Sequence, residues 1–554
     1  MIVILHSLLY NSDQMISLQQ IILPITHTEN DLQKKIAEIL GLTFDEVHNF
    51  TITRRAIDSR RKSQMIYFIY SIDLSIDKET DVLKNKIARK NTERHRLAIK
   101  EPYIYEIPKL EIRKTDKKPI IIGTGPCGLF AALICAKAGL KPLVIERGGD
   151  VDSRIKDVES FLSTGKLNPK SNVQFGEGGA GTFSDGKLYT LITNPRIKYI
   201  FDEFVKAGAP DSILSDAQPH IGTDKLRNVA KHIRNQIIDL GGEVRFNTKL
   251  TDIKIINNKL TAIILDDTEE IQTDTLVLAI GYSARDTYEM LFSRNIDMVQ
   301  KPFSIGVRIE HKADMINKSQ YDKFYTNKNL GRAKYKLVAH SETNRSVYTF
   351  CMCPGGYVVP SSSEEGVVVT NGMSEYAQVG ENSNSALLVN VGPEDFESDH
   401  ALAGVEFQRK LEKKAFELGG NNYYAPVQLV EDFLQKQTTQ KIRSIKPSYK
   451  PGVKLVALDE CLPDFVAASL REALPKFDNK INGFAHPDAV LTAIESRSSS
   501  PLRITRDKEN LQSNIVGIYP SGEGAGYAGG IVSSAVDGMR VSEAILEMFR
   551  KNEE

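Results

Sequence analysis

The chain has 554 residues, enough for two to four domains, and its 71 Lys and Arg balance its 71 Asp and Glu. With 41% apolar and 26% charged residues it has an ordinary globular composition, and the neutral balance gives no general attraction to nucleic acid or membranes. No apolar run approaches the roughly 20 residues that span a bilayer. The short apolar start MIVILHSLLY has no basic residue before it and no small-residue cleavage site, unlike a secretory signal. Five cysteines, few and odd in number, favour a reducing, cytoplasmic setting over a disulfide framework.

The first 118 residues are expected to form a separate domain with a ferredoxin-like β-α-β-β-α-β order. Its predicted elements are, in chain order, a strand at Ile16–Pro24, a helix at Asn30–Leu40, a strand at Gln64–Ile72 and a charged helix at Asp81–Lys100. Asn30 or Asp31 is expected to cap the first helix and Gly41 to end it. The polar run KTDKK, followed by Pro119, marks the domain boundary.

The sharpest pattern follows at residues 118–146. An apolar strand leads into GTGPCG, Gly123–Gly128, which opens the helix LFAALICAKAG, and a second strand, LVIE, comes next. Gly123 permits the tight turn, Gly125 lets a pyrophosphate approach the backbone, and Gly128 lets the helix pack closely on the sheet. The helix N-terminus offers free N–H groups and a positive dipole end to phosphates. The pattern predicts dinucleotide binding.

An acidic residue ends the second strand at the spacing that this motif requires. Glu146 stands 21 residues after Gly125, where a carboxylate can accept hydrogen bonds from both ribose hydroxyls of an adenosine. It would repel a 2′-phosphate, which favours FAD or NAD over NADP. Arg147 is expected either over the adenine or in solvent.

A second glycine loop, NVQFGEGGAGTFSDGKL at Asn172–Leu188, favours FAD over NAD. An NAD-dependent dehydrogenase needs one glycine loop, whereas a second close-approach loop suits a longer ligand that stretches across the domain. Its glycines would bring the backbone beside the flavin ring and pyrophosphate, and Thr182 and Ser184 would supply hydroxyl contacts.

Three later segments fit the same ligand. Gly241–Ile253 is predicted to be a strand that reaches the adenine near Leu250, and Thr273–Asp286 a strand that ends at Gly281. In Asn514–Ala535 a strand leads to a glycine cluster and to a helix near Ile531, whose dipole would face the charge that develops on a reduced flavin. The complete set of expected FAD contacts is Gly123, Gly125, Pro126, Cys127, Gly128, Glu146, Arg147, Gly176, Gly178, Gly179, Ala180, Gly181, Thr182, Ser184, Leu250, Gly281, Gly522, Glu523, Gly524, Ala525 and Gly526.

These motifs resemble the glutathione-reductase-like FAD superfamily and, more narrowly, the bacterial uncharacterised FAD-dependent dehydrogenase, or NAD(P)/FAD-dependent oxidoreductase, group. The matching segments are RRAIDSRRK, IIGTGPCGLFAAL, NVQFGEGGAGTFSDGKL, FCMCPGG, TNGMSEYA, SSSPLRI and YPSGEGAGYAGGIVSSA. The resemblance implies bound FAD, a ferredoxin-like N-terminal domain and a Rossmann-like FAD domain split by an inserted α+β substrate domain. It supplies no substrate. Thr124 and Cys127 stand where this fold often has Ala, and both are small enough for the helix to pack.

The resulting organisation is an α/β chain in four segments. They are a ferredoxin-like domain at 1–118, the first part of the FAD domain at 119–300, an inserted substrate or lid domain at 301–500, and the rest of the FAD domain at 501–554. The sequence has no second glycine motif that follows a strand and is itself followed by an acidic or basic residue to recognise the adenosine ribose. It therefore lacks a separate nicotinamide-binding motif, and a nicotinamide that reduces the flavin would dock transiently in the substrate cleft.

Other features leave the chemistry open. In FCMC, strand alternation would point Cys351 and Cys353 to one face, either as a redox relay beside the flavin or as small buried residues. No Cys or His set has metal-ligand spacing. RRAIDSRRK at Arg54–Lys62 suggests RNA or an acidic partner, although a solvated charged face is the favoured interpretation.

The main hypothesis is an FAD-dependent oxidoreductase that exchanges hydride or electrons with a small organic molecule, with no catalytic residue assigned. A flavoprotein that acts on RNA through its basic first domain and a non-catalytic redox sensor are the alternatives. The oligomeric state is left open.

Overall fold

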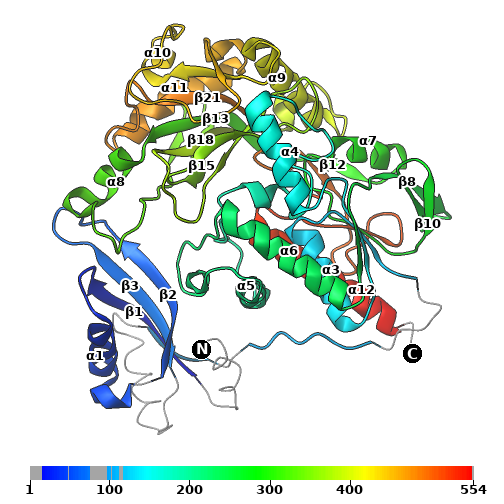
Figure 1. The fold of residues 1–554 in the computed structure, drawn as a ribbon, viewed down its shortest axis with the longest axis horizontal. Coiled ribbons are helices and arrows are strands. Elements are labelled where there is room, and N and C mark those ends of the chain that lie inside the picture. The colour runs from blue at the N-terminus through cyan, green and yellow to red at the C-terminus, as the bar shows by residue number, and fades with distance from the viewer. Residues whose placement is uncertain (1–14, 48, 75–95, 101–102, 111–116, 552–554) are drawn as a thin grey trace. The chain divides into compact units, whose positions relative to one another are not determined.

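The computed structural model describes residues 15–47, 49–74, 96–100, 103–110 and 117–551 (Figure 1). The chain divides into two compact units. Unit 1 consists of Met1–Glu106, Pro210–Pro219 and Gln320–Gly331, and unit 2 of Ile107–Ala209, His220–Ser319 and Arg332–Glu554. Both units combine helices with sheets, which confirms the expected mixture of α and β structure.

Unit 1 contains a four-stranded antiparallel sheet in the order β2-β3-β1-β4. Its strands and helices are β1 (Met15–Pro24), α1 (Glu29–Leu40), η1 (Phe44–Glu46), β2 (Phe50–Asp58), β3 (Tyr67–Leu74), β4 (Arg96–Lys100), η3 (Asp211–Leu214) and η4 (Asp322–Phe324). Helix α1 buries its apolar face, including Leu32 and Ile36, and contacts β1.

The N-terminal cap of α1 differs from the prediction. Thr28, rather than Asn30 or Asp31, is the cap residue. Its hydroxyl accepts a hydrogen bond from the Asp31 N–H at 3.3 Å, while the Asp31 carboxylate accepts one from the Thr28 N–H at 2.8 Å. This is a capping box, in which the side chain of each of the two residues accepts a hydrogen bond from the backbone N–H group of the other. The helix ends at Gly41, with a left-handed φ of 68°, as predicted.

The prediction of a helix throughout Asp81–Lys100 is wrong at its C-terminal end. Arg96–Lys100 forms β4 and pairs antiparallel with β1. Residues 81–95 lie outside the described part of the chain. Charge spacing suggested a helix, but alternation places Leu97 in the core between exposed Arg96 and Ala98.

The basic stretch Arg54–Lys62 occupies the end of β2 and the turn after it. Arg55 forms an ion pair of 2.9 Å with Asp216, and Arg60 forms one of 2.6 Å with Asp58. Part of this positive charge is therefore neutralised inside unit 1, in line with a solvated charged face. The nucleic-acid alternative stays a prediction.

Unit 2 is built around a five-stranded parallel sheet in the order β23-β11-β5-β6-β7. Its strands are β5 (Ile120–Ile122), β6 (Leu143–Ile145), β7 (Glu243–Arg245), β11 (Leu276–Leu278) and β23 (Ile518–Pro520). Strands β5, β6 and β11 are buried along their whole length, as expected for parallel strands covered on both faces. The Rossmann-like strand, turn and helix at residues 120–138 form where the sequence predicts them.

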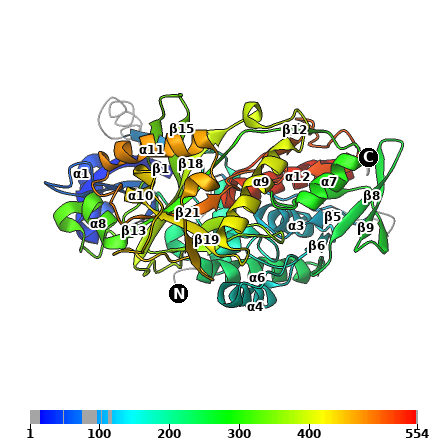
Figure 2. The ribbon, with the colours of Figure 1, turned by 90° about the horizontal axis from the view of Figure 1, so that it is seen from above.

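Helices α3 (Pro126–Ala138) and α12 (Ile531–Lys551) pack against each other, and α6 (Thr223–Asp239) packs against α3 (Figures 1 and 2). Helix α3 is buried nearly all round, which explains its almost uniformly apolar sequence. The first and last parts of unit 2 are thereby joined, although about 390 residues separate them in the sequence.

The predicted single strand over Gly241–Ile253 is wrong. The segment contributes β7 to the parallel sheet and then starts β8 (Leu250–Ile256), which belongs to a separate antiparallel sheet. That sheet has the order β10-β9-β8, with β9 (Lys259–Leu265) and β10 (Glu269–Gln272). The polar turn at Phe246–Lys249 redirects the chain between them.

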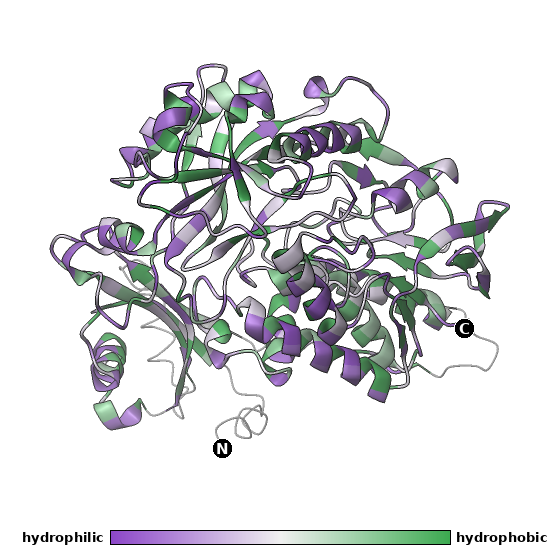
Figure 3. Ribbon diagram, turned by 45° about the horizontal axis from the view of Figure 1, so that its top comes forward, coloured by the Kyte–Doolittle hydropathy of each residue, from purple (hydrophilic) through white to green (hydrophobic). Residues whose placement is uncertain are grey.

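Residues 301–501 form mainly a seven-stranded sheet, and its strand order is β14-β15-β18-β13-β21-β19-β20. Its strands are β13 (Phe303–Lys312), β14 (Val338–His340), β15 (Ser346–Cys353), β18 (Asn382–Val391), β19 (Ala425–Leu429), β20 (Val453–Leu455) and β21 (Val490–Glu495). Two strand pairs flank it, β12 (Met298–Gln300) with β22 (Leu502–Ile504) and β16 (Tyr357–Pro360) with β17 (Thr370–Met373). Figure 3 shows hydrophobic residues concentrated on the strands and hydrophilic residues on outward helix faces.

The remaining helices of the described residues are α4 (Val151–Thr164), η2 (Ala180–Phe183), α5 (Arg196–Lys206), α7 (Arg285–Ser293), α8 (Ala313–Tyr321), η5 (Pro393–Asp395), α9 (Ala403–Gly419), α10 (Val430–Leu434), η6 (Leu458–Glu460) and α11 (Asp464–Asp478). Within the described ranges, no helix has both the length and the apolar character that a bilayer crossing requires.

Candidate functional site: a cavity between two glycine loops

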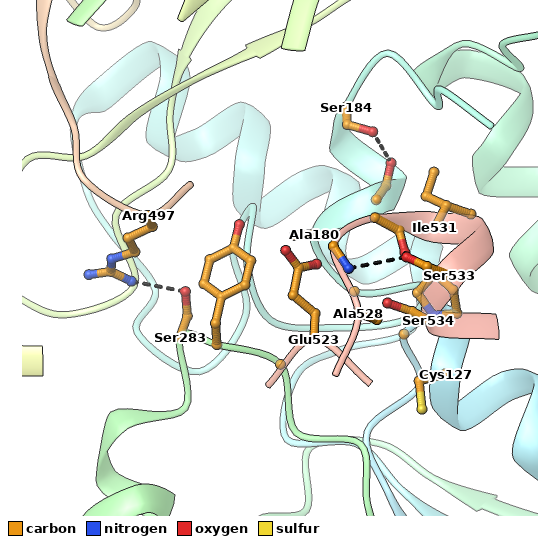
Figure 4. A pocket seen from close by; sticks show the side chains of 18 of the residues that line it. Cys127, Ala180, Ser184, Ser283, Arg497, Glu523, Ala528, Ile531, Ser533 and Ser534 are labelled. Carbon is orange, nitrogen blue, oxygen red and sulfur yellow. Dashed lines mark hydrogen bonds between the residues drawn. The ribbon is translucent and has the colours of Figure 1, made fainter. Parts of the chain in front are cut away.

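Unit 2 encloses a cavity of about 1100 Å³. Its walls come from the first glycine turn, the second glycine loop, the start of β8, the turn after β11 and the C-terminal glycine cluster, together with β14, β15 and the end of β21 from the seven-stranded sheet. In the view of Figure 4, Glu523 lies between the Arg497–Ser283 pair and the group formed by Ala180, Ser533 and Ser534. Segments that are far apart in the sequence therefore share one concave surface, as ligand sites usually require.

The first glycine turn has two kinds of glycine. A Cβ on Gly123, which has a φ of 101°, would lie 2.3 Å from the Ala279 carbonyl oxygen, and one on Gly128 would lie 1.8 Å from the Gly123 carbonyl oxygen. These two glycines are needed by the fold itself. A Cβ on Gly125 would meet nothing nearer than the Gly179 Cα at 3.9 Å, although Gly125 lines the cavity.

The second glycine loop lies directly against the first. The Gly178 N–H donates to the Thr124 carbonyl at 3.0 Å, and a Cβ on Gly179 would lie 3.0 Å from the Gly125 Cα. The buried guanidinium of Arg154 holds the loop in place by donating hydrogen bonds to the carbonyl groups of Asn172, Val173 and Glu177 at 2.7–2.9 Å. The loop is a fixed wall of the cavity.

The carboxylate of Glu146 is shared among backbone groups of both loops. One oxygen accepts from the N–H and the hydroxyl of Thr124 at 3.0 and 2.7 Å. The other accepts from the N–H groups of Gly148 and Gly176 at 2.9 and 3.0 Å. Because a carboxylate has about four lone-pair positions, these protein donors occupy its capacity. Glu146 lines the cavity, yet the two ribose hydrogen bonds expected from the sequence would require it to release protein donors.

Arg147 also lines the cavity, but its charge is engaged within the protein. Its guanidinium lies 4.2 Å from the centre of the Phe175 ring and pairs with both carboxylate oxygens of Asp286 at 3.0 and 2.6 Å. Burial opposes the charge of Asp286, but Arg147 and Lys249 outweigh it and hold the pKa of this carboxyl well below its usual range. Free solvation therefore does not describe Arg147, whose side chain is 16% exposed, and its position over the adenine stays a prediction.

The C-terminal glycine cluster and the residues after it form a further wall of the cavity. A Cβ on Gly524 would lie 2.7 Å from the backbone of Gly281, and one on Gly526 would lie 2.8 Å from the Leu502 carbonyl oxygen. The Asp537 carboxylate, on α12, accepts from the Gly522 N–H at 2.8 Å and thus fastens the cluster to the helix. Residues Ala528–Ser534, which include the first turn of α12, line the cavity.

Glu523 is the acidic side chain that this cluster presents to the cavity (Figure 4). Burial raises its pKa to about 7, while Lys301 acts in the opposite direction and Cys351 adds to the rise. Because this pKa is near neutral pH, the charge at this wall changes over the physiological range.

The predicted contact residues separate into two groups. Those that line the cavity are Gly123, Gly125, Pro126, Cys127, Glu146, Arg147, Gly179, Ala180, Gly181, Ser184, Leu250, Gly281, Glu523 and Gly526. Those behind the lining are Gly128, Gly176, Gly178, Thr182, Gly522, Gly524 and Ala525. The Thr182 hydroxyl, for example, is buried and donates to the Glu177 carbonyl at 3.1 Å, so its expected ligand contact does not fit this arrangement.

Sequence reasoning pointed to Cys351 at the far end of the cavity but missed Lys187, Tyr189 and Glu495. The lining there comes from the end of the second glycine loop, the residues just after it, β15 and the end of β21. Several of its apolar side chains are unusually exposed, namely Tyr189, Leu191, Ile192, Val338 and Phe350. No local pattern marks these positions, because the strands that bring them together are separated by about 150 residues.

Arg497, which also lines the cavity, serves an internal role. It pairs with Glu412 at 2.7 Å, and the same buried carboxylate pairs with Arg285 at 2.8 Å. The Arg497 guanidinium also donates to Ser283 and Ser363 at 3.1 and 2.6 Å. This network joins the turn after β11 to helix α9 and to the end of β21. No group of three or more His, Cys, Asp or Glu suited to a metal ion occurs in the described ranges.

Comparison with known proteins gives the following relatives. Residues 302–498 match a family model described as the C-terminal domain of FAD-dependent proteins, and residues 15–75 match a domain of unknown function. An uncharacterised protein of Clostridium beijerinckii is 47% identical over 521 residues, covering 94% of this chain and 96% of that protein.

Solved structures resemble the chain more remotely. Halogenase PltM in complex with phloroglucinol and FAD is 12% identical, with a TM-score of 0.36, over 78% of this chain and 70% of that one. The flavin-dependent brominase Bmp2 is 14% identical, with a TM-score of 0.36, over 79% and 80%. L-proline dehydrogenase from P. horikoshii is 12% identical, with a TM-score of 0.33, over 80% and 94%. These TM-scores are too low to carry an argument about this chain.

Proposed function

Because the chain belongs to the same family as the Clostridium beijerinckii protein and carries the C-terminal domain of FAD-dependent proteins, its cofactor is FAD, and we propose that it is an FAD-dependent oxidoreductase. One observation carries the proposal. Two glycine loops and the first turn of α12 line one cavity of about 1100 Å³, whose far end extends beyond the loops to a separate set of polar and apolar side chains. The loops form one end of a binding cavity, and the far end provides a place for a second reactant.

Two glycines support the fit of FAD to this cavity. Neither Gly125 nor Gly529 has a left-handed φ, and a Cβ on either would make no contact closer than 3.9 Å with the protein. Both line the cavity. Since the fold does not need glycine at these positions, a ligand that approaches the backbone there accounts for it.

Each end of the cavity has groups suited to one part of FAD. Gly125 and Pro126, at the start of α3, would hold the pyrophosphate at a helix N-terminus, and the start of α12 would hold another electronegative part of the cofactor. Glu146 and Arg147 line the region expected for the adenosine half. Bound FAD supplies the capacity to accept or donate two electrons with a proton.

We assign Glu146 a positioning role in this site. Its carboxylate joins the Thr124 backbone to Gly148 and Gly176, and so holds the two glycine loops in the register that forms the cavity. Contact with the ribose, if made through this residue, requires a change at one of those four hydrogen bonds. The other predicted contact residues that line the cavity are retained as proposed FAD contacts.

The second reactant is proposed to be a small organic molecule with an apolar part. Leu191 is 87% exposed and Val338 is 52% exposed although both line the cavity, so a bound apolar group would remove this surface from water. NAD(P)H is proposed as a transient reductant that docks in the same cleft.

The finer architecture is part of the same proposal. A five-stranded parallel sheet beside a three-stranded antiparallel sheet supports a glutathione-reductase-like FAD domain, with residues 301–500 as the inserted substrate domain. The order β2-β3-β1-β4 supports a ferredoxin-like arrangement in unit 1, whose second helix would lie outside the described residues. All five cysteines are free thiols, which supports a cytoplasmic location.

Anaerobic mixing of the purified chain with NADH or NADPH tests the reaction class. We expect the visible flavin absorbance to decrease with at least one of them and to recover when an electron acceptor is added. A flavin that stays oxidised with both nucleotides and with a panel of small organic reductants would contradict the oxidoreductase and favour a non-catalytic flavoprotein.

A further inference from the structure

Two cysteines meet a lysine at the far end of the cavity. The Lys187 Nζ lies 3.8 Å from the Cys351 Sγ and 3.7 Å from the Cys353 Sγ. Lys187 and Cys351 line the cavity, whereas Cys353 is fully buried behind it. One thiol is therefore accessible from the cavity and the other is protected from it.

The local backbone is irregular where the pair occurs. The pairing of β15 with β18 shifts register between Phe350 and Cys353, and Cys351 has a left-handed φ of 44°, which is strained for a side chain of this type. The simple alternation expected from FCMC is thus interrupted, yet both sulfur atoms still converge on Lys187. Backbone strain at a cavity wall is typical of a position that serves function.

The charged surroundings favour a thiolate. Besides Lys187, the buried Arg308 lies 3.8 Å from the Cys353 Sγ and donates to the Cys351 carbonyl at 3.0 Å. Asp185 pairs with Lys187 at 3.2 Å and Glu495 pairs with Arg308 at 3.3 Å, so each cation also has an acidic partner. The neighbouring titratable groups that complete this environment are Tyr189, Tyr335 and Glu523.

The two thiols differ in acidity. The hydrogen bond with Cys353 lowers the pKa of Cys351 well below its ordinary value, burial opposes this effect, and Lys187 and Arg308 lower it further. The same hydrogen bond, together with burial, raises the pKa of Cys353. The accessible thiol is thus the more acidic one, which is the arrangement that a nucleophilic and a resolving cysteine require.

We propose that Cys351 and Cys353 form a redox-active dithiol that exchanges with a small, uncharged organic disulfide in the cavity. The Cys351 thiolate attacks one sulfur of the disulfide, forms a mixed disulfide and releases one thiolate. Cys353 then loses its proton and attacks the Cys351 sulfur, which forms the Cys351–Cys353 bond and releases the second thiolate. The two released thiolates take up the two protons that the cysteines lose, so the disulfide gains two electrons and the dithiol loses two.

The class of disulfide follows from the lining. Tyr189, Leu191, Ile192, Val338 and Phe350 line the cavity with exposed apolar surface, and Lys187 already has Asp185 as its partner. An uncharged apolar disulfide would bury this surface, whereas a highly charged peptide disulfide would lose hydration without a free partner. Only the return of the protein disulfide to the dithiol, which takes two electrons and two protons, rests on the proposed function, with FAD as carrier.

The test uses the reduced, full-length protein and the uncharged probe 4,4′-dithiodipyridine, with released thiopyridone followed by absorbance. We expect a fast release of two thiopyridones per chain and, by mass spectrometry, a 351–353 peptide that is lighter by two hydrogens. At pH 6 the fast phase should exceed the rate of an ordinary exposed thiol by about tenfold, because an ordinary thiol is then less than about 1% ionised. The anionic probe glutathione disulfide should react more slowly.

Variants separate the roles of the two thiols. C353S should release one thiopyridone and keep a mixed disulfide at Cys351, and C351S should lose the fast phase. K187Q should slow the fast phase about tenfold at pH 6, corresponding to about one unit of pKa, and K187R should restore most of it. Cys127, Cys135 and Cys461 serve as internal controls, because burial raises the pKa of each thiol to about 12.

The outcomes are decisive even if a variant fails to fold, since the wild-type measurement stands alone. A slow reaction, or a stable mixed disulfide in the wild type, would overturn the dithiol. FAD content is measured in the same samples by visible absorbance. Thiol failure with FAD retained would reject only this inference, whereas a colourless protein with intact thiol exchange would reject only the proposed function.

Discussion

The carboxylate of Glu146 accepts a hydrogen bond from the Gly176 N–H at 3.0 Å, although 30 residues separate them. This contact joins the end of β6 to the second glycine loop, and the hydrogen bonds from Thr124 join both to the first glycine turn. This buried side chain thus helps to hold the two loops together, beside the Gly178–Thr124 hydrogen bond.

Replacement of Glu146 by Gln tests this role. Whichever way the amide turns, its NH2 group faces two N–H or O–H donors, so we expect the free energy of unfolding to fall by about 2–4 kcal/mol and FAD retention to fall with it. Chemical denaturation and the FAD content of the purified protein measure the two effects. E509Q, a change at an exposed carboxylate, is the matched control; equal stability of E146Q and E509Q would refute the role assigned to Glu146.

Glu412 should be among the most sensitive positions in unit 2. Its buried carboxylate lies between Arg285 and Arg497. The E412Q variant would leave these two buried guanidinium groups with Glu364 as the acidic partner that both still have. We expect a loss of about 3–5 kcal/mol in the free energy of unfolding. E406Q, on the exposed side of the same helix, should change stability little. A similar stability for the two variants would show that the network is unimportant.

The pH dependence of this network has a defined sign. Burial alone would raise the pKa of Glu412, but Arg285 and Arg497 outweigh it and hold the pKa well below its usual range. Stability from this carboxylate is therefore present above its unfolded pKa, near 4.5, and is lost as the pH falls below that value. The stability difference between wild type and E412Q should narrow between pH 5 and pH 3. A constant difference would count against the ion pairs.

The stability that Glu523 contributes should depend on pH in the opposite direction to that of Glu412. Burial raises its pKa to about 7 from an ordinary value of 4.5, so the folded state holds its proton more tightly than the unfolded state. Stability is then lost as the pH rises from about 4.5 to about 7. In protein freed of FAD, E523Q should match the wild type at pH 4 and exceed it by about 1–3 kcal/mol at pH 8. Denaturation at the two pH values, with E509Q as control, tests this; a pH-independent difference would place the Glu523 pKa at its ordinary value.

The sequence predicted those features that depend on neighbouring residues. The strand, glycine turn and helix at residues 120–138 form as expected, because Gly123 and Gly128 are required by contacts within one β-α unit and its neighbour β11. The end of α1 at Gly41 follows from a left-handed φ that glycine adopts easily.

Features that depend on distant partners could not be predicted. Arg147 pairs with Asp286, 139 residues away, and no local pattern distinguishes it from an arginine that covers adenine. The buried Arg154 holds the second glycine loop by donating to its carbonyl groups, the nearest of which, that of Asn172, lies 18 residues away in the sequence. The convergence of Lys187 with Cys351 depends on a bulge in β15 that strand alternation cannot reveal.

The central claim is that the first glycine turn and the C-terminal glycine cluster leave backbone surface bare for FAD at Gly125 and Gly529, and binding of FAD to the G125A variant tests it most directly. Ala at this position has an ordinary φ and no protein atom within 3.9 Å of its Cβ, so we expect an unfolding free energy no lower than that of the wild type and a Kd for FAD raised at least about tenfold. G128A, whose Cβ would lie 1.8 Å from the Gly123 carbonyl, should instead fail to fold. A G125A protein that binds FAD as tightly as the wild type would contradict the claim.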